Sequence, residues 1–237
     1  MFVLLIDAGN TRAKWRYLNN KEVQSEGVFA YADDLPSVWQ GFDSVSKVWV
    51  ASVTEQPHLQ ALLQEKYQAK VHWLHHPLAS TGYFQHCYEH PERLGVDRWL
   101  AMLGARRHSQ KAVLVVDAGT ALTIDLMSAD NKHEGGYIVP GVQMAQDALF
   151  NNTAKVKPFA GEQGVDQMAP GQNTYNCVAA GIQRQRFALV QSVINEFQNY
   201  QPFICGGDGQ WLAQQLNLHY YNNLVLDGME SICVGSL

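Results

Sequence analysis

The chain alternates short apolar runs with amphipathic stretches, a pattern typical of α/β proteins. Val3–Asp7 is almost wholly apolar and ends in an aspartate, which predicts a buried strand. Beyond the turn at residues 8–10, apolar and polar side chains alternate along Thr11–Leu18. That alternation predicts a half-buried second strand and therefore a hairpin. Further strands are predicted at Val23–Phe29, Lys47–Ala51, Val71–Leu74, Ala112–Asp117, Pro202–Cys205 and Leu218–Tyr221.

Apolar residues at helical spacing separate these strands. The longest such stripe predicts a helix from about Thr174 to Tyr200, which we expect to serve the core and a dimer interface. Shorter helices are predicted at Asp33–Trp39, Pro57–Tyr67, Gly95–His108 and Gln210–Gln215. Residues 151–173 form the most loop-like segment.

One nine-residue pattern occurs twice in the sequence. VLLIDAGNT at 3–11 and VLVVDAGTA at 113–121 share an apolar strand closed by Asp-Ala-Gly, and their aspartates, Asp7 and Asp117, are 110 residues apart. Repetition at this distance predicts a duplicated α/β unit, with domains at 1–110 and 111–237 and a ligand cleft between them. A doubly wound nucleotide fold would place a helix after the first glycine turn, whereas strand-like alternation follows both turns here.

Composition excludes several classes of protein. With 46% apolar and 16% charged residues the chain is expected to be globular, and no apolar run is long enough to cross a bilayer. A net charge of −5 argues against a nucleic-acid surface and against a polybasic membrane anchor. The four cysteines form no CxxC pair, so we expect a reducing, cytoplasmic setting. His72, His75 and His76 lack neighbouring ligands that would complete a zinc site, and a polar strand end is the expected reading.

The two Asp-Ala-Gly turns are the candidate functional sites. An ionised aspartate at the end of an apolar strand is costly unless a cation or hydrogen-bond donors compensate it. Gly9 and Gly119 allow backbone N–H groups to approach a phosphate, and Asn10, Thr11 and Thr120 add short polar side chains. Either turn alone could simply close a hairpin. Two equivalent turns in one chain favour phosphate binding, with Lys14 as a nearby positive charge.

Neither a Walker-type GxxxxGK[ST] loop nor a GxGxxG motif is present. Phosphate-binding hairpin turns in two repeated halves instead resemble the actin-like ATPase superfamily, which includes sugar kinases, Hsp70 and actin. The matching stretches narrow the resemblance to type III pantothenate kinase along nearly the whole chain. They are DAGNTRAK (7–14), PERLGVDR (91–98), DAGTALTID (117–125), GGYIVPG (135–141), T-x6-G (174–181) and CGGD (205–208).

The resemblance implies two ribonuclease-H-like domains, each a mixed sheet flanked by helices. It implies a kinase that transfers the ATP γ-phosphate to the 4′-hydroxyl of pantothenate and works as a homodimer with shared active sites. The first ATP loop would be Asp7, Ala8, Gly9, Asn10, Thr11, Arg12, Ala13 and Lys14, with Thr120 as a second ATP contact. Asp7 would lie near Mg²⁺, and Asp117 would bind an activating monovalent cation, K⁺ or NH₄⁺.

By the same resemblance Asp97 would be the catalytic base, and Arg98 would bind the pantothenate carboxylate. Tyr88 would pack on the substrate, Gly95 and Val96 would complete its loop, and Thr174 would reach pantothenate from the partner subunit. Phosphoryl transfer needs positioning, charge neutralisation and a carboxylate for the nucleophile's proton, which Asp97 could supply. From the residues alone, Asp97 could equally be a helix cap paired with the adjacent arginine.

Several points stay open at the level of sequence. GGYIVPG is either a strand with a turn at each end or a segment whose glycines approach the substrate, and Asp125 either holds the second phosphate loop or caps a strand. The family commonly has Thr where Cys205 precedes the glycine pair near the adenosine, and Asn is frequent at His90. Another kinase of the superfamily, acting on a sugar or acetate, and a non-catalytic transcriptional accessory protein are the alternative functions.

Overall fold

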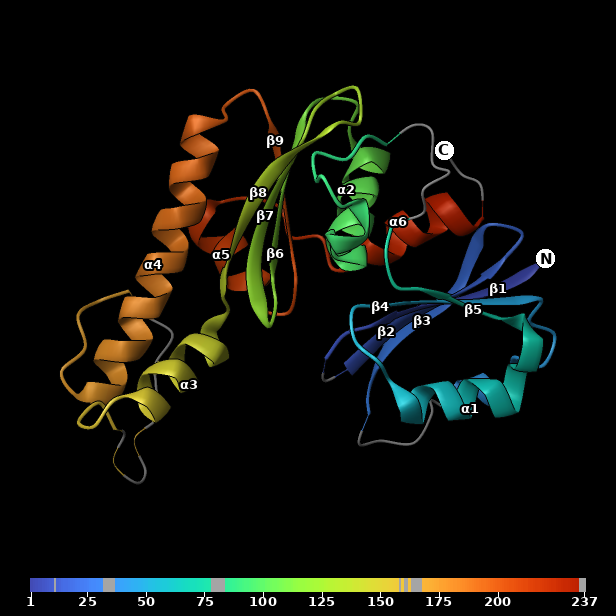
Figure 1. The fold of residues 1–237 in the computed structure, drawn as a ribbon, viewed down its shortest axis with the longest axis horizontal. Helices are drawn as coiled ribbons and strands as arrows, with labels where there is room; N and C mark the ends of the chain where they lie inside the picture. Colours follow the sequence, from blue (N-terminus) through green and yellow to red (C-terminus); the bar gives the residue numbers. More distant parts are fainter. Residues whose placement is uncertain are drawn as a thin grey trace. The chain divides into compact units, whose positions relative to one another are not determined.

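A computed structural model describes all 237 residues except 11, 32–36, 78–83, 158, 160–161, 163–167 and 235–237. Contacts divide the chain into two compact units (Figure 1). Unit 1 comprises Met1–Gln110, Met127–Glu134 and Asn223–Leu237, and unit 2 comprises Lys111–Leu126 and Gly135–Asn222. The first unit thus contains the predicted residues 1–110 together with two later segments of the chain.

Unit 1 is built on a mixed five-stranded sheet with the order β3-β2-β1-β4-β5. β1 (Phe2–Ala8) pairs antiparallel with β2 (Arg12–Asn19), which pairs antiparallel with β3 (Glu22–Ala30). β4 (Lys47–Ser52) and β5 (Val71–Leu74) continue the sheet in parallel on the other side of β1. The helical elements of this unit are the 3₁₀ turns η1 (Ser37–Gly41), η2 (Gln68–Lys70) and η3 (Pro91–Arg93) and the helices α1 (Pro57–Tyr67), α2 (Val96–His108) and α6 (Leu224–Cys233).

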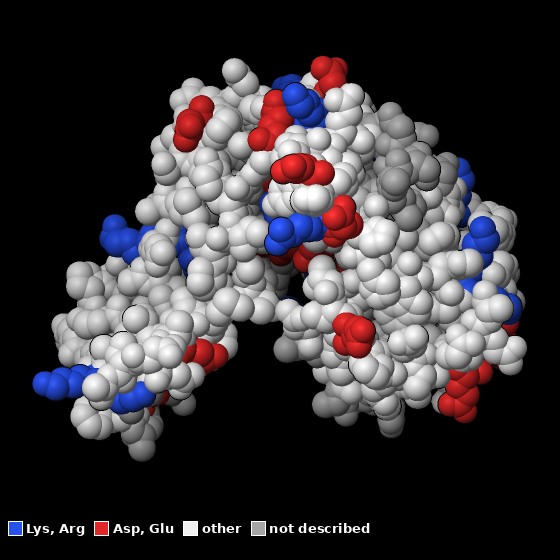
Figure 2. Space-filling model, in the orientation of Figure 1, with Lys and Arg blue, Asp and Glu red and all other residues white. Residues whose placement is uncertain are grey.

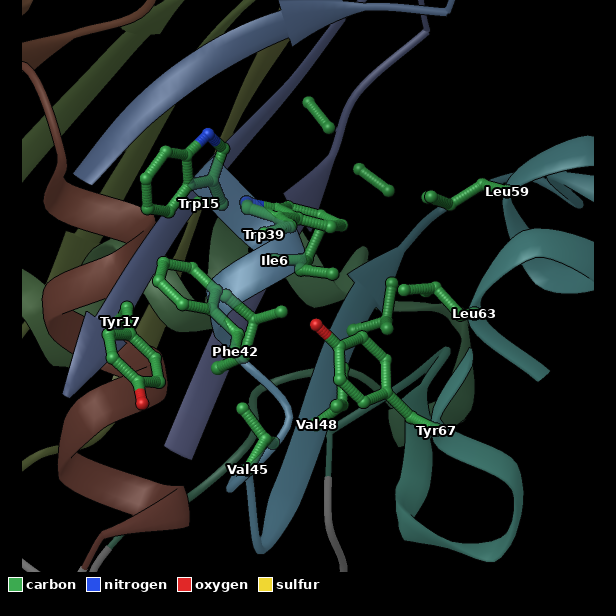
Figure 3. Close-up of a cluster of buried hydrophobic side chains, with 14 of the residues drawn as sticks. Ile6, Trp15, Tyr17, Trp39, Phe42, Val45, Val48, Leu59, Leu63 and Tyr67 are labelled. Carbon is green, nitrogen blue, oxygen red and sulfur yellow. The ribbon is translucent and has the colours of Figure 1, made fainter. Parts of the chain in front are cut away.

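One face of this sheet carries an aromatic-rich core (Figure 3). Leu4 and Ile6 of β1 pack with Trp15 and Tyr17 of β2, and the cluster extends to Leu59, Leu63 and Tyr67 of α1. Because side chains alternate along a strand, Val3 and Leu5, also fully buried, face the opposite side of the sheet. That side is covered by α6, which contacts β1, β2 and β4.

α2 and α6 pack with their backbones in direct apposition. A Cβ atom placed on Gly104 of α2 would lie 2.0 Å from the carbonyl oxygen of Leu224 in α6. A Cβ on Gly228 of α6 would lie 1.9 Å from the carbonyl oxygen of Leu100 in α2. The two glycines therefore permit an approach that any side chain would prevent, and α2 is buried along most of its length as a result.

A buried charge network joins the same helices to the sheet. The guanidinium of Arg16 on β2 donates to Asp227 Oδ1 at 2.8 Å and to Glu230 Oε2 at 3.0 Å, both on α6. Arg107 of α2 reaches Glu230 Oε1 at 2.9 Å. Arg16 and Glu230 are buried, and since burying either charge without a partner is unfavourable, their ion pair restrains how α6 lies across β2.

Unit 2 contains a four-stranded sheet with the order β8-β7-β6-β9. β6 (Val113–Ala118) and β9 (Gln201–Cys205) run parallel. β6 and β7 (Ala121–Met127) are joined by only two residues, a connection that makes them an antiparallel hairpin. With β8 (His133–Pro140) as the third strand, this sheet repeats the order β3-β2-β1-β4 of unit 1, and the predicted duplication is confirmed.

In its described residues, unit 2 has the helices α3 (Val142–Asn152), α4 (Thr174–Glu196) and α5 (Gly209–Leu216). Its core joins alternate residues of β6 and β7, such as Val116 and Ile124, to Val190 and Val193 of α4 and Leu212 of α5. Apart from the predicted helix Asp33–Trp39, the predicted strands and helices up to β9 recur with shifts of a few residues at their ends, and α4 ends four residues before the predicted Tyr200.

The structure differs from the prediction at four elements. The predicted strand Leu218–Tyr221 is wrong: only Tyr220 makes a bridge, to Ile204. Most of the predicted helix Asp33–Trp39 lies outside the described residues, and its described end belongs to the 3₁₀ turn η1. α3 and α6 were not predicted. In α3 no residue is buried, so no apolar stripe faces a core, and α6 contains Gly228 in its centre, which is unfavourable in a helix.

The glycine contact between α2 and α6 yields a stability prediction. We expect Gly228→Val to lower the melting temperature strongly, because the new side chain must separate two helices whose backbones touch; overpacking typically costs about 1–3 kcal/mol or more. Thermal unfolding followed by circular dichroism measures the shift. Gly181→Ala in α4, where nothing lies within 4 Å of the added Cβ, is the control and should not destabilise the protein. An unchanged melting temperature for Gly228→Val would contradict this packing.

Candidate active site

The first Asp-Ala-Gly turn lies at the carboxyl end of β1 in unit 1. Asp7 is partly buried and faces Lys14 across the β1–β2 pair, in the register Asp7↔Lys14. The carbonyl oxygen of Gly9 accepts hydrogen bonds from Tyr31 Oη at 2.8 Å and from Gln56 Nε2 at 3.3 Å. Side chains from outside the hairpin therefore anchor the turn at Gly9, and around it Asn10 and Arg12 are exposed while Ala13 is buried. Thr11 lies outside the described residues.

The pKa of Tyr31 reflects the burial and the negative charge around this turn. Burial of the phenol, and secondly the negative charge of Asp7, raise the pKa of Tyr31 to about 12. The hydroxyl therefore stays protonated and donates to Gly9 throughout the physiological range. Ser52, at the end of β4, adds a hydrogen bond from Oγ to the carbonyl oxygen of Ala8 at 3.3 Å. Sequence reasoning missed Tyr31, Ser52 and Gln56, because nothing local ties them to residues 7–9.

The second turn lies at the carboxyl end of β6 in unit 2 and matches the first closely. Asp117 is partly buried, and the pattern of exposure along residues 111–120 is the same, position by position, as along residues 1–10. The N–H of Gly119 donates to the carbonyl oxygen of Ala121 at 2.9 Å, which closes the turn. The carboxyl ends of sheet strands are where α/β proteins bind ligands, and both aspartates occupy such ends.

A two-glycine turn after β9 supports the second Asp-Ala-Gly turn. Gly206 has φ of 89°, and a Cβ atom on it would lie 2.4 Å from both the carbonyl oxygen of Ala118 and Asp117 Oδ1. The N–H of Asp208 donates to the same carbonyl oxygen of Ala118 at 2.8 Å. Position 206 must therefore be glycine both for its backbone conformation and for this contact.

The glycines of GGYIVPG approach the chain's own backbone. A Cβ on Gly141 would lie 2.3 Å from the carbonyl oxygen of Gly119, and the N–H of Gly141 donates to Thr120 O at 3.0 Å. A Cβ on Gly136 would lie 2.1 Å from Ile124 O and 2.9 Å from the carboxylate of Asp125. These contacts brace the second turn and β7, and Asp125 is a buried residue within β7.

A third group of candidate residues gathers at the start of α2 in unit 1. Gly95 precedes the helix and Val96 is buried at its first position. Asp97, partly buried, accepts a hydrogen bond at Oδ1 from the backbone N–H of Arg98 at 2.8 Å. Arg98 is 7% exposed and donates from Nη1 to Tyr88 Oη at 2.9 Å. Asp97, Arg98 and Tyr88 thus form one cluster of a carboxylate, a guanidinium and a phenol.

Unit 2 also contains a pocket of about 370 Å³, within the size range of small-molecule sites. Gly207 and Asp208, from the turn that supports Asp117, form part of its wall. Helix α4 contributes Gln183 and Arg186, and Trp211 of α5 lines it as well. The same short segment therefore contacts the second Asp-Ala-Gly turn and borders a cavity.

Thr174 is the first residue of α4, whose N-terminus is capped by Asn173 Oδ1 accepting from the N–H of Asn176 at 2.7 Å. The neighbouring Tyr175 packs on Phe150 of α3 with ring centroids 5.5 Å apart. The candidate residues accordingly fall into two sets. Unit 1 holds Asp7–Lys14, Tyr88 and Gly95–Arg98, and unit 2 holds Asp117, Thr120 and Thr174.

The histidine-rich segment has ordinary structural contacts. His72 stacks on Trp49 with ring centroids 4.7 Å apart, and His75 Nδ1 lies 3.3 Å from the carbonyl oxygen of Ser52. Within the part of the chain that the structure describes, no group of three or more His, Cys, Asp or Glu side chains could hold a metal ion.

Several known proteins are similar to this chain in fold or in sequence. A crystal structure of a putative 2-dehydro-3-deoxygalactonokinase from Sinorhizobium meliloti superposes with a TM-score of 0.62 at 12% identity, covering 99% of this chain and 100% of that one. A conserved putative Baf family transcriptional activator from Campylobacter jejuni gives a TM-score of 0.60 at 24% identity, covering 98% of each chain. At these identities the two likenesses establish the fold alone.

The repeated sheet order, the aspartate turns at equivalent strand ends and the structural likeness define an α/β protein built from two repeated mixed sheets flanked by helices. The family model for type III pantothenate kinase matches residues 3–196. A type III pantothenate kinase from Marinobacter nauticus is 34% identical over 97% of this chain and 97% of its own length. The chain belongs to the type III pantothenate kinase family.

Proposed function

We infer that the protein is an ATP-dependent pantothenate kinase, which transfers the γ-phosphate of ATP to the 4′-hydroxyl of pantothenate and so performs the first step of coenzyme A biosynthesis. The observation that carries this inference is the family match over residues 3–196, which spans both aspartate turns and the start of α2. The cluster of Asp97, Arg98 and Tyr88 supplies groups that the reaction needs.

ATP binding is assigned to the two turns. In this proposal Asp7–Lys14 and Thr120 contact the phosphates, and Asp7 lies near Mg²⁺. The pairing of Asp7 with Lys14 supports the first part, because it brings a carboxylate for the metal and an ammonium for phosphate to one strand end. The pocket beside Gly207 takes the nucleoside, since the turn that borders it also supports the second phosphate turn.

Pantothenate binding is assigned to the start of α2. Arg98 binds the substrate carboxylate through its planar guanidinium, which suits a carboxylate better than a point charge does. Its hydrogen bond to Tyr88 supports this role, because it restrains the guanidinium while the phenol ring packs on the substrate. Gly95 and Val96 complete the loop, and Thr174 reaches pantothenate from the partner subunit.

Asp97 is the proposed catalytic base. Its Oδ1 accepts from Arg98 N, which restrains the orientation of the carboxylate at the start of α2. A carboxylate in this position accepts the hydroxyl proton as the oxygen attacks the γ-phosphorus.

Asp117 is the proposed ligand of a monovalent cation, K⁺ or NH₄⁺, which neutralises charge on the phosphates when bound. The residues fit such an ion in kind: the carboxylate lies at a strand end beside backbone carbonyl groups, and hard cations prefer oxygen ligands. Gly206 keeps that carboxylate free of steric interference, because any side chain there would lie against Oδ1.

A homodimer with shared active sites is part of the proposal. Four apolar side chains are well exposed on β8 and α3: Tyr137, Ile138, Met144 and Leu149, at 40%, 60%, 46% and 39%. No residue of α3 is buried. A second copy covering this face would remove the apolar area from water, and the Phe150–Tyr175 contact links the face to Thr174.

Pantothenate and ATP are thus the proposed ligands, and a cytoplasmic location follows from a reaction that uses ATP.

A role as a regulator that binds nucleic acid is not favoured. The net charge is −5, and on the face in Figure 2 the basic side chains of the described residues are scattered among acidic ones. In the described part of the chain, no helix is long and apolar enough to cross a membrane.

A coupled assay with MgATP, K⁺ and pantothenate tests the function. We expect turnover with pantothenate and none with a panel of sugars or acetate, because a neutral sugar makes no use of Arg98. Replacement of K⁺ by Na⁺ should reduce the rate. Phosphorylation of a sugar in place of pantothenate would overturn the inference, and indifference to the ion would remove the cation from Asp117.

Asp97→Asn should lower kcat by roughly 10²–10⁴ while ATP binding persists, because the amide keeps the shape and the hydrogen bond from Arg98 but cannot take a proton. Steady-state kinetics and ATP titration measure the two effects. Turnover close to that of the native enzyme would exclude Asp97 as the base.

Arg98→Ala should raise KM for pantothenate about 10-fold or more and leave KM for ATP nearly unchanged, because a charge-assisted hydrogen bond to the carboxylate is lost. Arg93→Ala, which removes an exposed arginine of the preceding 3₁₀ turn, is the matched control. Equal increases in both constants for Arg98→Ala would argue against carboxylate recognition.

A further inference from the structure

His133 is a fully buried histidine that the proposed mechanism does not use. It is the first residue of β8, its exposed fraction is 0%, and it lies in the segment Met127–Glu134, which packs within unit 1. Full burial is unusual for histidine, because its ring carries two polar nitrogen atoms. An apolar side chain would fill a buried space without that cost, so the surroundings of the imidazole indicate what this ring contributes.

The imidazole packs directly on the tyrosine of the proposed substrate site. Its ring centroid lies 5.7 Å from that of Tyr88, with an angle of 31° between the two planes. On Phe84 it stacks with ring centroids 6.4 Å apart and an angle of 22°. Nδ1 lies 3.3 Å from Sγ of Cys87, the residue before Tyr88. His133 therefore contacts the segment 84–88 at three of its side chains.

The backbone of His133 is anchored to the same segment. Its N–H donates to Gln85 O at 2.8 Å, and the N–H of Gln85 donates to Asn131 O at 3.0 Å. Asn131 is held in turn by Arg106 of α2, whose Nε donates to Asn131 Oδ1 at 2.6 Å. Because Arg106 is 4% exposed, this anchor belongs to the folded interior of unit 1. The imidazole is thus fixed in place relative to α2.

Tyr88 connects this support to the proposed carboxylate-binding arginine. Arg98 donates from Nη1 to Tyr88 Oη at 2.9 Å, and its guanidinium carbon lies 5.8 Å from the centroid of the phenol ring. The phenol therefore contacts the imidazole of His133 as well as the guanidinium. Tyr88 is only partly buried, so without the imidazole its side chain would gain rotamer freedom and restrain the guanidinium less.

We propose that His133 is a positioning residue for pantothenate binding, which holds the phenol of Tyr88 beside Arg98 through ring packing. The inference rests on the proposed function, because it adds a residue to that substrate site. Since the imidazole is fully buried, it acts through Tyr88 and not by touching the substrate. Loss of the ring should therefore weaken pantothenate binding and leave the chemical step intact.

The test is His133→Ala, alone and combined with Tyr88→Ala. We expect the single variant to raise KM for pantothenate about 3- to 10-fold with kcat and KM for ATP nearly unchanged, because an aromatic contact of the substrate tyrosine is lost. In the Tyr88→Ala background the same substitution should have no further effect on that KM, since the residue through which it acts is absent. Steady-state kinetics of the native protein, both single variants and the double variant measure this coupling.

Two further variants separate positioning from a loss of stability. Leu63→Ala empties a fully buried position of α1, so it should lower the melting temperature and leave KM for pantothenate unchanged. His133→Phe keeps a flat ring beside Tyr88 and should hold that KM within about twofold of the native value. Circular dichroism melting shows which variants are folded, and His133→Phe carries the test if His133→Ala unfolds below the assay temperature.

The outcomes distinguish this proposal from the proposed function. A rise in KM that is confined to pantothenate and vanishes in the Tyr88→Ala background supports the positioning role. Equal rises for pantothenate and ATP, additive effects in the double variant, the same rise in Leu63→Ala, or a KM for His133→Phe as high as that of Tyr88→Ala each overturn it. These results leave the kinase assignment standing, whereas absence of pantothenate turnover by the native protein overturns both.

Discussion

The contact of Gly206 with Asp117 and Ala118 is the constraint on which the candidate site of unit 2 depends. It brings the turn after β9 so close to the second Asp-Ala-Gly turn that no side chain fits between them, and Asp208 locks the approach with a backbone hydrogen bond. The far side of the same turn borders the pocket. A movement of this turn would therefore displace both the second Asp-Ala-Gly turn and the wall of the pocket. The proposed positions of the nucleoside and the phosphates are mechanically linked in this way.

The first turn reaches a similar geometry by other means. Where unit 2 uses close glycine contacts, unit 1 uses side-chain donors, with Tyr31 and Gln56 on the carbonyl oxygen of Gly9 and Ser52 on that of Ala8. The duplicated sheets thus keep the strand order and the aspartate while the support around the turn has diverged.

Much of the fold could be predicted because its sequence patterns are local. Apolar strands closed by Asp-Ala-Gly predicted β1 and β6 and the duplication, and helical spacing predicted α1 and α2 nearly to the residue. α6 was missed because its central Gly228 is unfavourable in a helix and is explained only by the distant α2. Tyr31 and Gln56 were missed for the same reason: their roles arise from contacts between segments far apart in the chain. The substrate residues rested on family resemblance, since Gly-x-Asp-Arg alone is equally a helix start.

Helix α6 has a consequence for how the protein forms during synthesis. Unit 1 contains Met1–Gln110 together with Asn223–Leu237, so its sheet lacks the cover of α6 until the ribosome has passed all the segments of unit 2. The segments of unit 2 emerge earlier and carry their own core. Until α6 has been made, the sheet face that holds Val3 and Leu5 and the contact surface at Gly104 lack their partner helix, so unit 1 is completed only after the segments of unit 2 have been synthesised.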